Sequence, residues 1–176
     1  TEDEKRFYTW TLQSHIDLAK AVWLDYCECK MIDTIAREPL WRHLINYRCG
    51  TGHSVSFVGN VHEGPHALNS RNTTRMRPGM VVTDEPGVYE TDLVGIRIEN
   101  ELVCVHKADN QYGTFLGFEP LMFVPIATSP ILPGVLDKDE IAWLNDYHRQ
   151  VFAKLAPHLN DEERSWLAEK CAAIGC

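Results

Sequence analysis

Zinc motifs, membrane spans and an excess of basic residues are all missing from this sequence. None of the six cysteines forms a C-x-x-C pair, and their spacing matches no zinc ribbon. No uninterrupted apolar run approaches the roughly 18 residues that a membrane helix needs. Basic side chains number 17 against 25 acidic ones, and the net charge of -8 argues against nucleic acid as a partner.

The start of the chain and its cysteines indicate a cellular compartment. Residues 1–6 are charged and are not followed by an apolar signal segment, so nothing suggests export. Free thiols are typical of cytosolic proteins, and we interpret the cysteines in this way. Cys27 and Cys29 are close enough to bind metal together, but such a pair is more often incidental. The sequence therefore predicts a cytoplasmic protein with neither a membrane nor a nucleic acid as partner.

The N-terminal quarter of the sequence has the periodicity of helices. Thr1 and Glu4 have the spacing of a capping box at the start of the first one. A second helical pattern covers residues 33–45, where Pro39 removes a backbone donor and is expected to kink or interrupt the helix. The expected apolar face of the first helix consists of Tyr8, Leu12, Ile16, Ala19 and Trp23.

After Cys49 the sequence changes to glycines and short apolar runs, which are typical of strands and turns. From Asp137 onward the helical period returns, and Asn160 is placed to cap a shorter last helix. Helices, then a sheet, then helices predict an α+β domain. The expected strands cover residues 81–82, 94–98, 102–105 and 121–126, and residues 130–134 are the expected linker before the last helices.

His53, Glu85 and Glu99 are the side chains best suited to chemistry. His53 lies among glycines, which allow close approach to a ligand, and Glu85 precedes a Pro-Gly turn at a strand end. One imidazole and two carboxylates form a mixed ligand set suited to Mn, Co, Zn or Fe. On residue type and spacing, other interpretations stay open. His53 is then an ordinary turn residue, and Glu99 is either solvated or paired with Arg97.

Three segments carry a resemblance to a known family. They are GTGHSVSFVGNVHEGPHAL (50–68), DEPGVY (84–89) and GIRIEN (95–100). In this order, with about 22 residues from His62 to the second segment, they resemble the signature of the X-prolyl aminopeptidase branch of the creatinase and methionine aminopeptidase-like metallopeptidases. The opening helix up to AREPLW, and the later stretches GFEPLMFVPI and DEIAWLNDYHRQVFAKLAPHL, are similar to the longer, eukaryotic-type members. The resemblance thus covers nearly the whole chain.

The resemblance implies the α+β pita-bread fold. Residues 1–128 would be the C-terminal part of the catalytic domain, and residues 129–176 would be a C-terminal helical extension. It also implies two divalent metal ions, usually manganese, and hydrolysis of the first peptide bond of a substrate whose second residue is proline. Two cations that share a water acidify it, and a nearby carboxylate can take its proton.

The family's site residues carry over one by one. His53 would be a metal ligand, Glu85 would be both a ligand and the general base, and Glu99 would bridge the two metals. His62 would be a catalytic histidine that contacts substrate and helps to handle protons. Arg97 and Tyr89 would support the substrate-binding side of the site.

Two departures from the family concern the metal site. The family uses two more aspartate ligands from a hairpin upstream of the first helix, and a histidine still further upstream. The four aspartates before Cys49 lack the D-x10-D setting of that hairpin. We therefore expect an N-terminally incomplete fold that holds one metal ion or none and is inactive by itself. Ser54 and Ser56 replace glycines that usually surround the ligand histidine, and a serine held at positive φ would be strained.

The predicted function is that of a metal-dependent exopeptidase, as part of a longer parent enzyme that acts on X-Pro peptides. Two alternatives remain: an X-Pro dipeptidase of the same superfamily, and a non-catalytic pita-bread module for binding or dimerisation. The helical extension favours the aminopeptidase, whereas Ser54 and Ser56 lean toward the module. The aromatic residues of the extension either cover the partner in a homodimer or pack on the chain itself. They are Trp143, Tyr147, Phe152 and Trp166.

Overall fold

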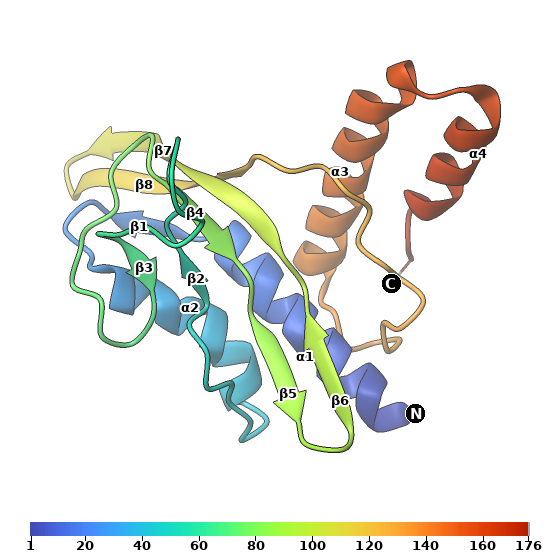
Figure 1. Cartoon of the computed structure of the whole chain (residues 1–176), viewed down its shortest axis with the longest axis horizontal. Coiled ribbons are helices and arrows are strands. Elements are labelled where there is room, and N and C mark those ends of the chain that lie inside the picture. The colour runs from blue at the N-terminus through green and yellow to red at the C-terminus, as the bar shows by residue number, and fades with distance from the viewer. Residues whose placement is uncertain (176) are drawn as a thin grey trace. The chain divides into compact units, whose positions relative to one another are not determined.

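The computed structural model describes residues 1–175, which fall into two compact units. One unit is Trp10–Leu121, and the other combines Thr1–Thr9 with Met122–Cys176. All strands in the described part of the chain belong to the first unit (Figure 1). The expected domain boundary after residue 128 stays a prediction.

The order of elements confirms the expected succession of helices, sheet and helices. In chain order the first unit contains α1 (Glu2–Ala19, which begins in the other unit), β1 (Val22–Leu24), α2 (Cys29–Trp41), β2 (Gly52–His53), β3 (Ala67–Leu68), β4 (Val81–Asp84), β5 (Gly87–Glu90), β6 (Val94–Arg97), β7 (Asn100–Asn110) and β8 (Gly113–Pro120). The other unit contains α3 (Lys138–Leu155), the short 3-10 helix η1 (Ala156–His158) and α4 (Asp161–Lys170).

The ends of the first two helices agree only in part with the sequence pattern. The Glu4 N–H donates to Thr1 Oγ1 at 3.3 Å and the Thr1 hydroxyl donates to Glu4 Oε2 at 2.7 Å, which confirms the capping pair. Placing Trp23 on that helix is wrong, because Trp23 lies in β1 and pairs with β8. α2 begins at Cys29 and continues through Pro39 without interruption.

The main sheet is antiparallel, with the strand order β1-β8-β7-β4. The strands expected at 81–82, 94–98 and 102–105 are confirmed as β4, β6 and β7. Two smaller antiparallel pairs, β2-β3 and β5-β6, complete the strands of this unit. β5 and β6 follow directly on β4, so the turn that begins with Glu85 lies where the main sheet ends.

Helices α1 and α2 lie next to each other against this sheet (Figure 1). The Ser14 hydroxyl of α1 donates to the Ala36 carbonyl of α2, which ties the two helices together. Trp23 packs on Phe118 across β1 and β8, with ring centroids 4.6 Å apart. The buried core consists of apolar residues from both layers: Leu12, Ile16, Leu18, Ile32, Leu40, Val82, Leu102, Cys104 and Leu116.

The expected strand at residues 121–126 is wrong, because this segment forms no strand and β8 precedes it. Its backbone N–H groups donate hydrogen bonds to side chains of α3 instead. The Val124 N–H donates to the Tyr147 hydroxyl at 3.2 Å, and the Ile126 N–H donates to His148 Nε2 at 3.1 Å. Apolar residues here serve to pack on α3, since Phe123 and Ile126 cover the cluster around Tyr147.

The helical unit buries most of its aromatic side chains on itself. Trp143 stacks on Tyr147 with ring centroids 5.4 Å apart, and Phe152 packs on the same cluster. Trp166 is the exception, with 56% of its surface exposed. Asn160 caps α4 through a capping box, as expected from the sequence. Most of the aromatic residues that were considered as a homodimer surface therefore pack within the unit itself.

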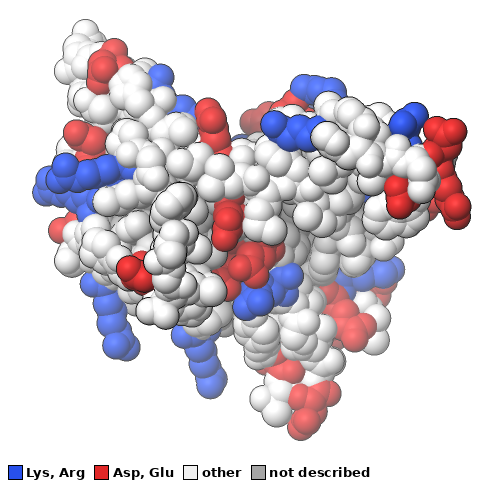
Figure 2. All heavy atoms as spheres, turned by 45° about the horizontal axis from the view of Figure 1, so that its top comes forward, with Lys and Arg blue, Asp and Glu red and all other residues white. Residues whose placement is uncertain are grey.

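The surface carries charges of both signs. Figure 2 shows acidic and basic side chains interspersed on the face in view. Many exposed pairs are three residues apart on helices, such as Arg6 with Asp3 at 2.8 Å. Among the described residues, no helix has the length and hydropathy needed to cross a bilayer.

Candidate active site

A pocket of about 470 Å³ lies where β2 meets the end of β4. Five of the six predicted site residues line it: His53, His62, Glu85, Tyr89 and Arg97. Glu99 is not part of its lining, although Arg97 connects it to Glu85. The structure thus brings together, in one pocket, residues that are up to 44 positions apart in the sequence.

Gly52 explains how His53 comes so close to β4. A Cβ atom at Gly52 would lie 1.8 Å from the carbonyl oxygen of Thr83, which no side chain can tolerate. Without that atom, the His53 N–H reaches Thr83 Oγ1 at 2.9 Å. The Glu85 N–H in turn donates to the carbonyl of Thr51 at 2.8 Å. The G-T-G-H segment and the end of β4 are therefore joined by hydrogen bonds from both sides.

The two ring nitrogens of His53 have different partners. Nδ1 lies 3.0 Å from the Ser54 carbonyl, which can only accept, so Nδ1 carries a hydrogen. Nε2 lies 3.1 Å from Glu85 Oε1, which already accepts the Thr83 hydroxyl at 2.9 Å. In a neutral ring two lone pairs would face each other here, so this contact needs a proton or a metal cation between the atoms.

The separation of these two atoms fits a shared metal ion. Two ligands about 2.2 Å from one ion, at right angles, lie about 3.1 Å apart. An imidazole whose other nitrogen donates to a backbone carbonyl, next to a carboxylate, is a common arrangement at divalent metals. His53 and Glu85 therefore fit a metal ion both in donor type and in spacing.

Glu99 has a different neighbour. Its Oε2 lies 3.2 Å from Arg97 Nε, and Arg97 Nη1 lies 3.3 Å from Glu85 Oε2, so one guanidinium separates the two carboxylates. The negative charge of Glu99 is the main cause of the raised pKa of Arg97. In the described residues, no group of three or more His, Cys, Asp or Glu side chains is arranged to hold a metal. This matches the alternative interpretation from the sequence, in which Glu99 is paired with Arg97. The role of Glu99 as a bridging metal ligand stays a prediction.

His62 and Tyr89 reach the pocket in different ways. The His62 ring stacks on His53 with centroids 3.7 Å apart and planes 24° apart, so it lies directly beside the first predicted ligand. Tyr89 lies in β5 and is 55% exposed, which leaves it open to a ligand in the pocket. Their catalytic and substrate-binding roles stay predictions.

Ser54 and Ser56 are not strained. The described non-glycine residues with positive φ are Leu44 and Asp92, so neither serine adopts the conformation for which strain was expected. Ser54 is buried, and its backbone N–H donates to the His66 carbonyl at 3.2 Å. Its hydroxyl is a buried polar atom without a hydrogen-bond partner, which is unfavourable.

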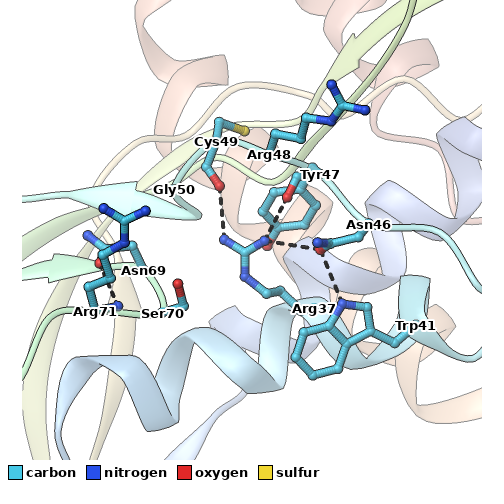
Figure 3. A pocket seen from close by; sticks show the side chains of 10 residues that line it. All are labelled: Arg37, Trp41, Asn46, Tyr47, Arg48, Cys49, Gly50, Asn69, Ser70 and Arg71. Carbon is cyan, nitrogen blue, oxygen red and sulfur yellow. Dashed lines mark hydrogen bonds between the residues drawn. The ribbon is translucent and has the colours of Figure 1, made fainter.

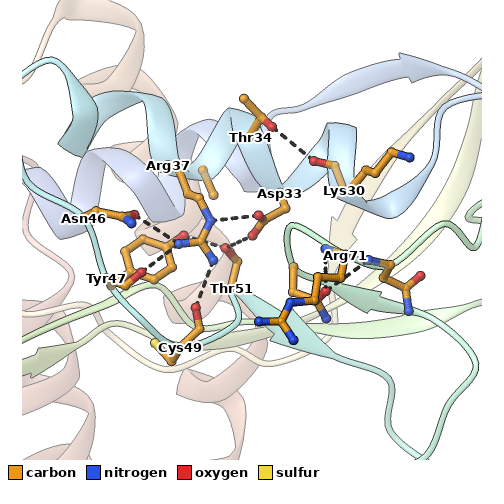
Figure 4. A network of polar contacts seen from close by, with 12 residues as sticks. Lys30, Asp33, Thr34, Arg37, Asn46, Tyr47, Cys49, Thr51 and Arg71 are labelled. Carbon is orange, nitrogen blue, oxygen red and sulfur yellow. Dashed lines mark hydrogen bonds and ion pairs between the residues drawn. The ribbon is translucent and has the colours of Figure 1, made fainter.

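Sequence reasoning missed a buried polar network that holds the segment before His53 (Figure 4). Arg37 of α2 donates to Asp33 Oδ2 at 2.8 Å, to the Tyr47 carbonyl at 2.8 Å and to the Cys49 carbonyl at 2.9 Å. The Thr51 hydroxyl also donates to Asp33. The spacing of Asp33 and Arg37, four apart on a helix, was the available signal.

A second pocket, of about 590 Å³, adjoins the first and shares Cys49, Gly50 and Asn69 with it. Figure 3 shows Arg37 pointing into the polar network, while Arg48 and Arg71 extend on either side. Three arginines and no carboxylate line this pocket. Burial raises the pKa of the Cys49 thiol, so this shared residue is a neutral thiol at neutral pH.

Asp84, next to Glu85, is fully buried against α1. Its Oδ2 lies 3.1 Å from His15 Nδ1, and both side chains are inaccessible to water. Burial raises the pKa of Asp84, while the nearby His15 acts in the opposite direction. A carboxyl at this depth is compatible with the fold because an imidazole faces it.

The chain belongs to the metallopeptidase family M24. The model of this family matches residues 1–106, and a model of the C-terminal region of the family matches residues 114–174. The fold is accordingly the pita-bread fold that the motifs implied.

The relatives are aminopeptidases of the predicted branch. The chain is 43% identical to aminopeptidase P2 of Arabidopsis thaliana, over 93% of this chain and 24% of that protein. It is 39% identical to aminopeptidase P1 of Lotus japonicus, over 98% of this chain and 27% of that protein. A solved X-prolyl aminopeptidase from Caenorhabditis elegans, described as a cytosolic enzyme with a di-nuclear active site, matches with a TM-score of 0.92 and 37% identity, covering 99% of this chain and 29% of that one. The chain thus spans about a quarter of the length of its curated relatives.

Proposed function

We propose that these residues form part of the active site of a metal-dependent exopeptidase that cleaves the bond before a proline in the second position. The contact of His53 Nε2 with Glu85 Oε1 at 3.1 Å is the observation that carries the proposal, because a divalent metal ion, like a proton, can join these two acceptors. Membership of the family and the similarity to X-prolyl aminopeptidases support the substrate class.

Each residue has a role that its position supports. His53 and Glu85 hold a metal, and Glu85 also accepts a proton during hydrolysis. His62, stacked on His53, contacts the substrate and holds or donates a proton. When bound, two divalent cations supply Lewis acidity toward the scissile carbonyl and a water. Arg97 and Tyr89 line the substrate side of the pocket.

The metal content follows from the ligand count. Two ions, with manganese as the proposed metal, need more anionic ligands than His53, Glu85 and Glu99 supply. We propose that the two-ion site forms in the natural full-length protein, where Glu99, which contacts Arg97 at 3.2 Å, would be a further ligand. The 176 residues on their own hold one ion or none.

The test compares the natural full-length protein with the 176-residue polypeptide, each with saturating manganese and an X-Pro peptide. We expect turnover for the former and none for the latter, because the second cation contributes several kcal/mol to the transition state and each 1.4 kcal/mol changes the rate about tenfold. A peptide with alanine in the second position is the control for specificity. Turnover by the 176-residue polypeptide would contradict the reading of its site as incomplete, and an inactive, metal-free full-length protein would favour a binding module.

We propose further that the full-length protein is a cytoplasmic homodimer. The description of the nematode relative as cytosolic supports the compartment. Trp166, exposed at 56%, is the side chain of the helical extension best placed to meet a partner. Light scattering is expected to give twice the monomer mass, and Trp166→Ala to shift the equilibrium toward monomer. A monomeric wild-type protein at high concentration would rule out the dimer.

A further inference from the structure

Thr83 lies between two predicted metal ligands and bonds to both. Its oxygen accepts the His53 backbone N–H at 2.9 Å, and its hydroxyl donates to Glu85 Oε1, also at 2.9 Å. A hydroxyl has a single hydrogen, so donation to Glu85 leaves none for the His53 carbonyl, which lies at a longer 3.4 Å. Thr83 is only 3% exposed, so water does not compete for these bonds.

The position of Thr83 in β4 explains why it meets Glu85. Residues two apart in an extended segment face the same side, which directs Thr83 and Glu85 together toward β2. The branched side chain of threonine restricts rotation about χ1, so the backbone of β4 sets the direction of the hydroxyl. Thr83 does not line the pocket, and it therefore acts on the site only through the two residues it bonds.

Glu85 has its two oxygens in different environments as a result. Oε1 receives the Thr83 hydroxyl and lies 3.1 Å from His53 Nε2, whereas Oε2 lies 3.3 Å from Arg97 Nη1. Without the hydroxyl, the charged Arg97, 3.3 Å away, would remain as a competing partner of this carboxylate. Glu85 would then be free to turn toward Arg97 and away from His53.

We infer that Thr83 is a positioning residue that holds Glu85 Oε1 beside His53 Nε2, so that both donors meet one divalent cation. The inference rests on the proposed function, since it assigns Thr83 a role in metal binding. Partners that orient metal ligands typically change metal affinity by about 10–100-fold when they are removed.

The experiment measures Mn²⁺ binding to the natural full-length protein by titration calorimetry, and side-chain positions by crystallography. Thr83→Val removes the hydroxyl and should weaken Mn²⁺ binding by about 10–100-fold, whereas Thr83→Ser keeps it and should stay within a few-fold of wild type. Thr9→Val is the matched control. Thr9 is also fully buried, and its hydroxyl also makes one donated and one accepted bond, to the Lys5 carbonyl at 2.8 Å and from the Leu132 N–H at 3.0 Å. Thr9→Val should lower the free energy of unfolding and leave the Mn²⁺ affinity unchanged.

The outcomes separate this inference from the proposed function. Thr83→Val with wild-type Mn²⁺ affinity, and with Glu85 still beside His53 in its crystal structure, would overturn the positioning role. The same holds if Thr9→Val weakens Mn²⁺ binding as much as Thr83→Val does. A wild-type protein that binds no Mn²⁺ would refute the proposed function. The crystal structures would then decide about Thr83 alone, according to whether Glu85 turns toward Arg97 in the valine variant.

Discussion

Replacement of Glu85 by glutamine is expected to reduce kcat/KM of the full-length protein by about 10³-fold or more on an X-Pro peptide. Both carboxylate oxygens are engaged in the structure, Oε1 with His53 and Thr83 and Oε2 with Arg97. An amide keeps the shape of the side chain but removes the negative charge and one acceptor. On the roles proposed for Glu85, the variant would lose a metal ligand and a proton acceptor together.

The control for this variant is Glu90→Gln, which removes the same charge from an exposed residue at the end of β5. Glu90 does not line the pocket, so its replacement should leave kcat/KM near the wild-type value. The measurement is steady-state hydrolysis with saturating manganese, together with metal content. Retention of more than a tenth of wild-type activity in Glu85→Gln would show that Glu85 is neither a ligand nor the base.

Gly52→Ala is expected to lower the free energy of unfolding by about 3 kcal/mol and to abolish activity. The new Cβ would lie 1.8 Å from the Thr83 carbonyl oxygen, and the neighbour is backbone that cannot rotate away. β2 must therefore move away from β4. The hydrogen bond from the His53 N–H to Thr83 would be lost with it.

Gly50→Ala provides the comparison within the same motif. Its Cβ would meet the Leu68 carbonyl oxygen at 3.4 Å, which is an ordinary contact. Urea unfolding of the two variants should therefore differ, with Gly50→Ala within about 1 kcal/mol of wild type. Equal stability of the two variants would contradict the close approach of β2 and β4.

Local chemistry predicted the capped helix starts, but it placed the start of α2 at residue 33 instead of Cys29 and misplaced the end of α1. The caps formed by Thr1 and Asn160 depend on side chains three residues apart, so they are visible in the sequence. The end of α1 was misplaced because Trp23 continues the apolar period, yet pairs with Leu116 of β8, nearly a hundred residues away. Likewise, the apolar segment that ends at Ile126 has Tyr147 and His148 of α3 as hydrogen-bond partners rather than a neighbouring strand.

Motifs predicted the candidate ligands of the site but not the residues that hold those ligands in place. His53 and Glu85 were recognised because their segments resemble a family, and the structure places them in contact. Thr83 was missed, although its position two residues before Glu85 in a strand was a usable signal. The contact between Thr83 and His53 could not be predicted from residue spacing, because it depends on β2 lying against β4.

The sequence by itself determined the fold class, the coarse succession of helices, sheet and helices, the family and the residue types of the candidate site. These properties depend on periodicity, capping and short motifs, all of which are local. Only the tertiary structure decided which atoms meet: His53 with Glu85 through a glycine that permits close approach, and Glu99 with Arg97 in place of a ligand cluster. The reason is that these contacts join segments far apart in the chain, and their geometry depends on how strands and helices pack rather than on local propensity.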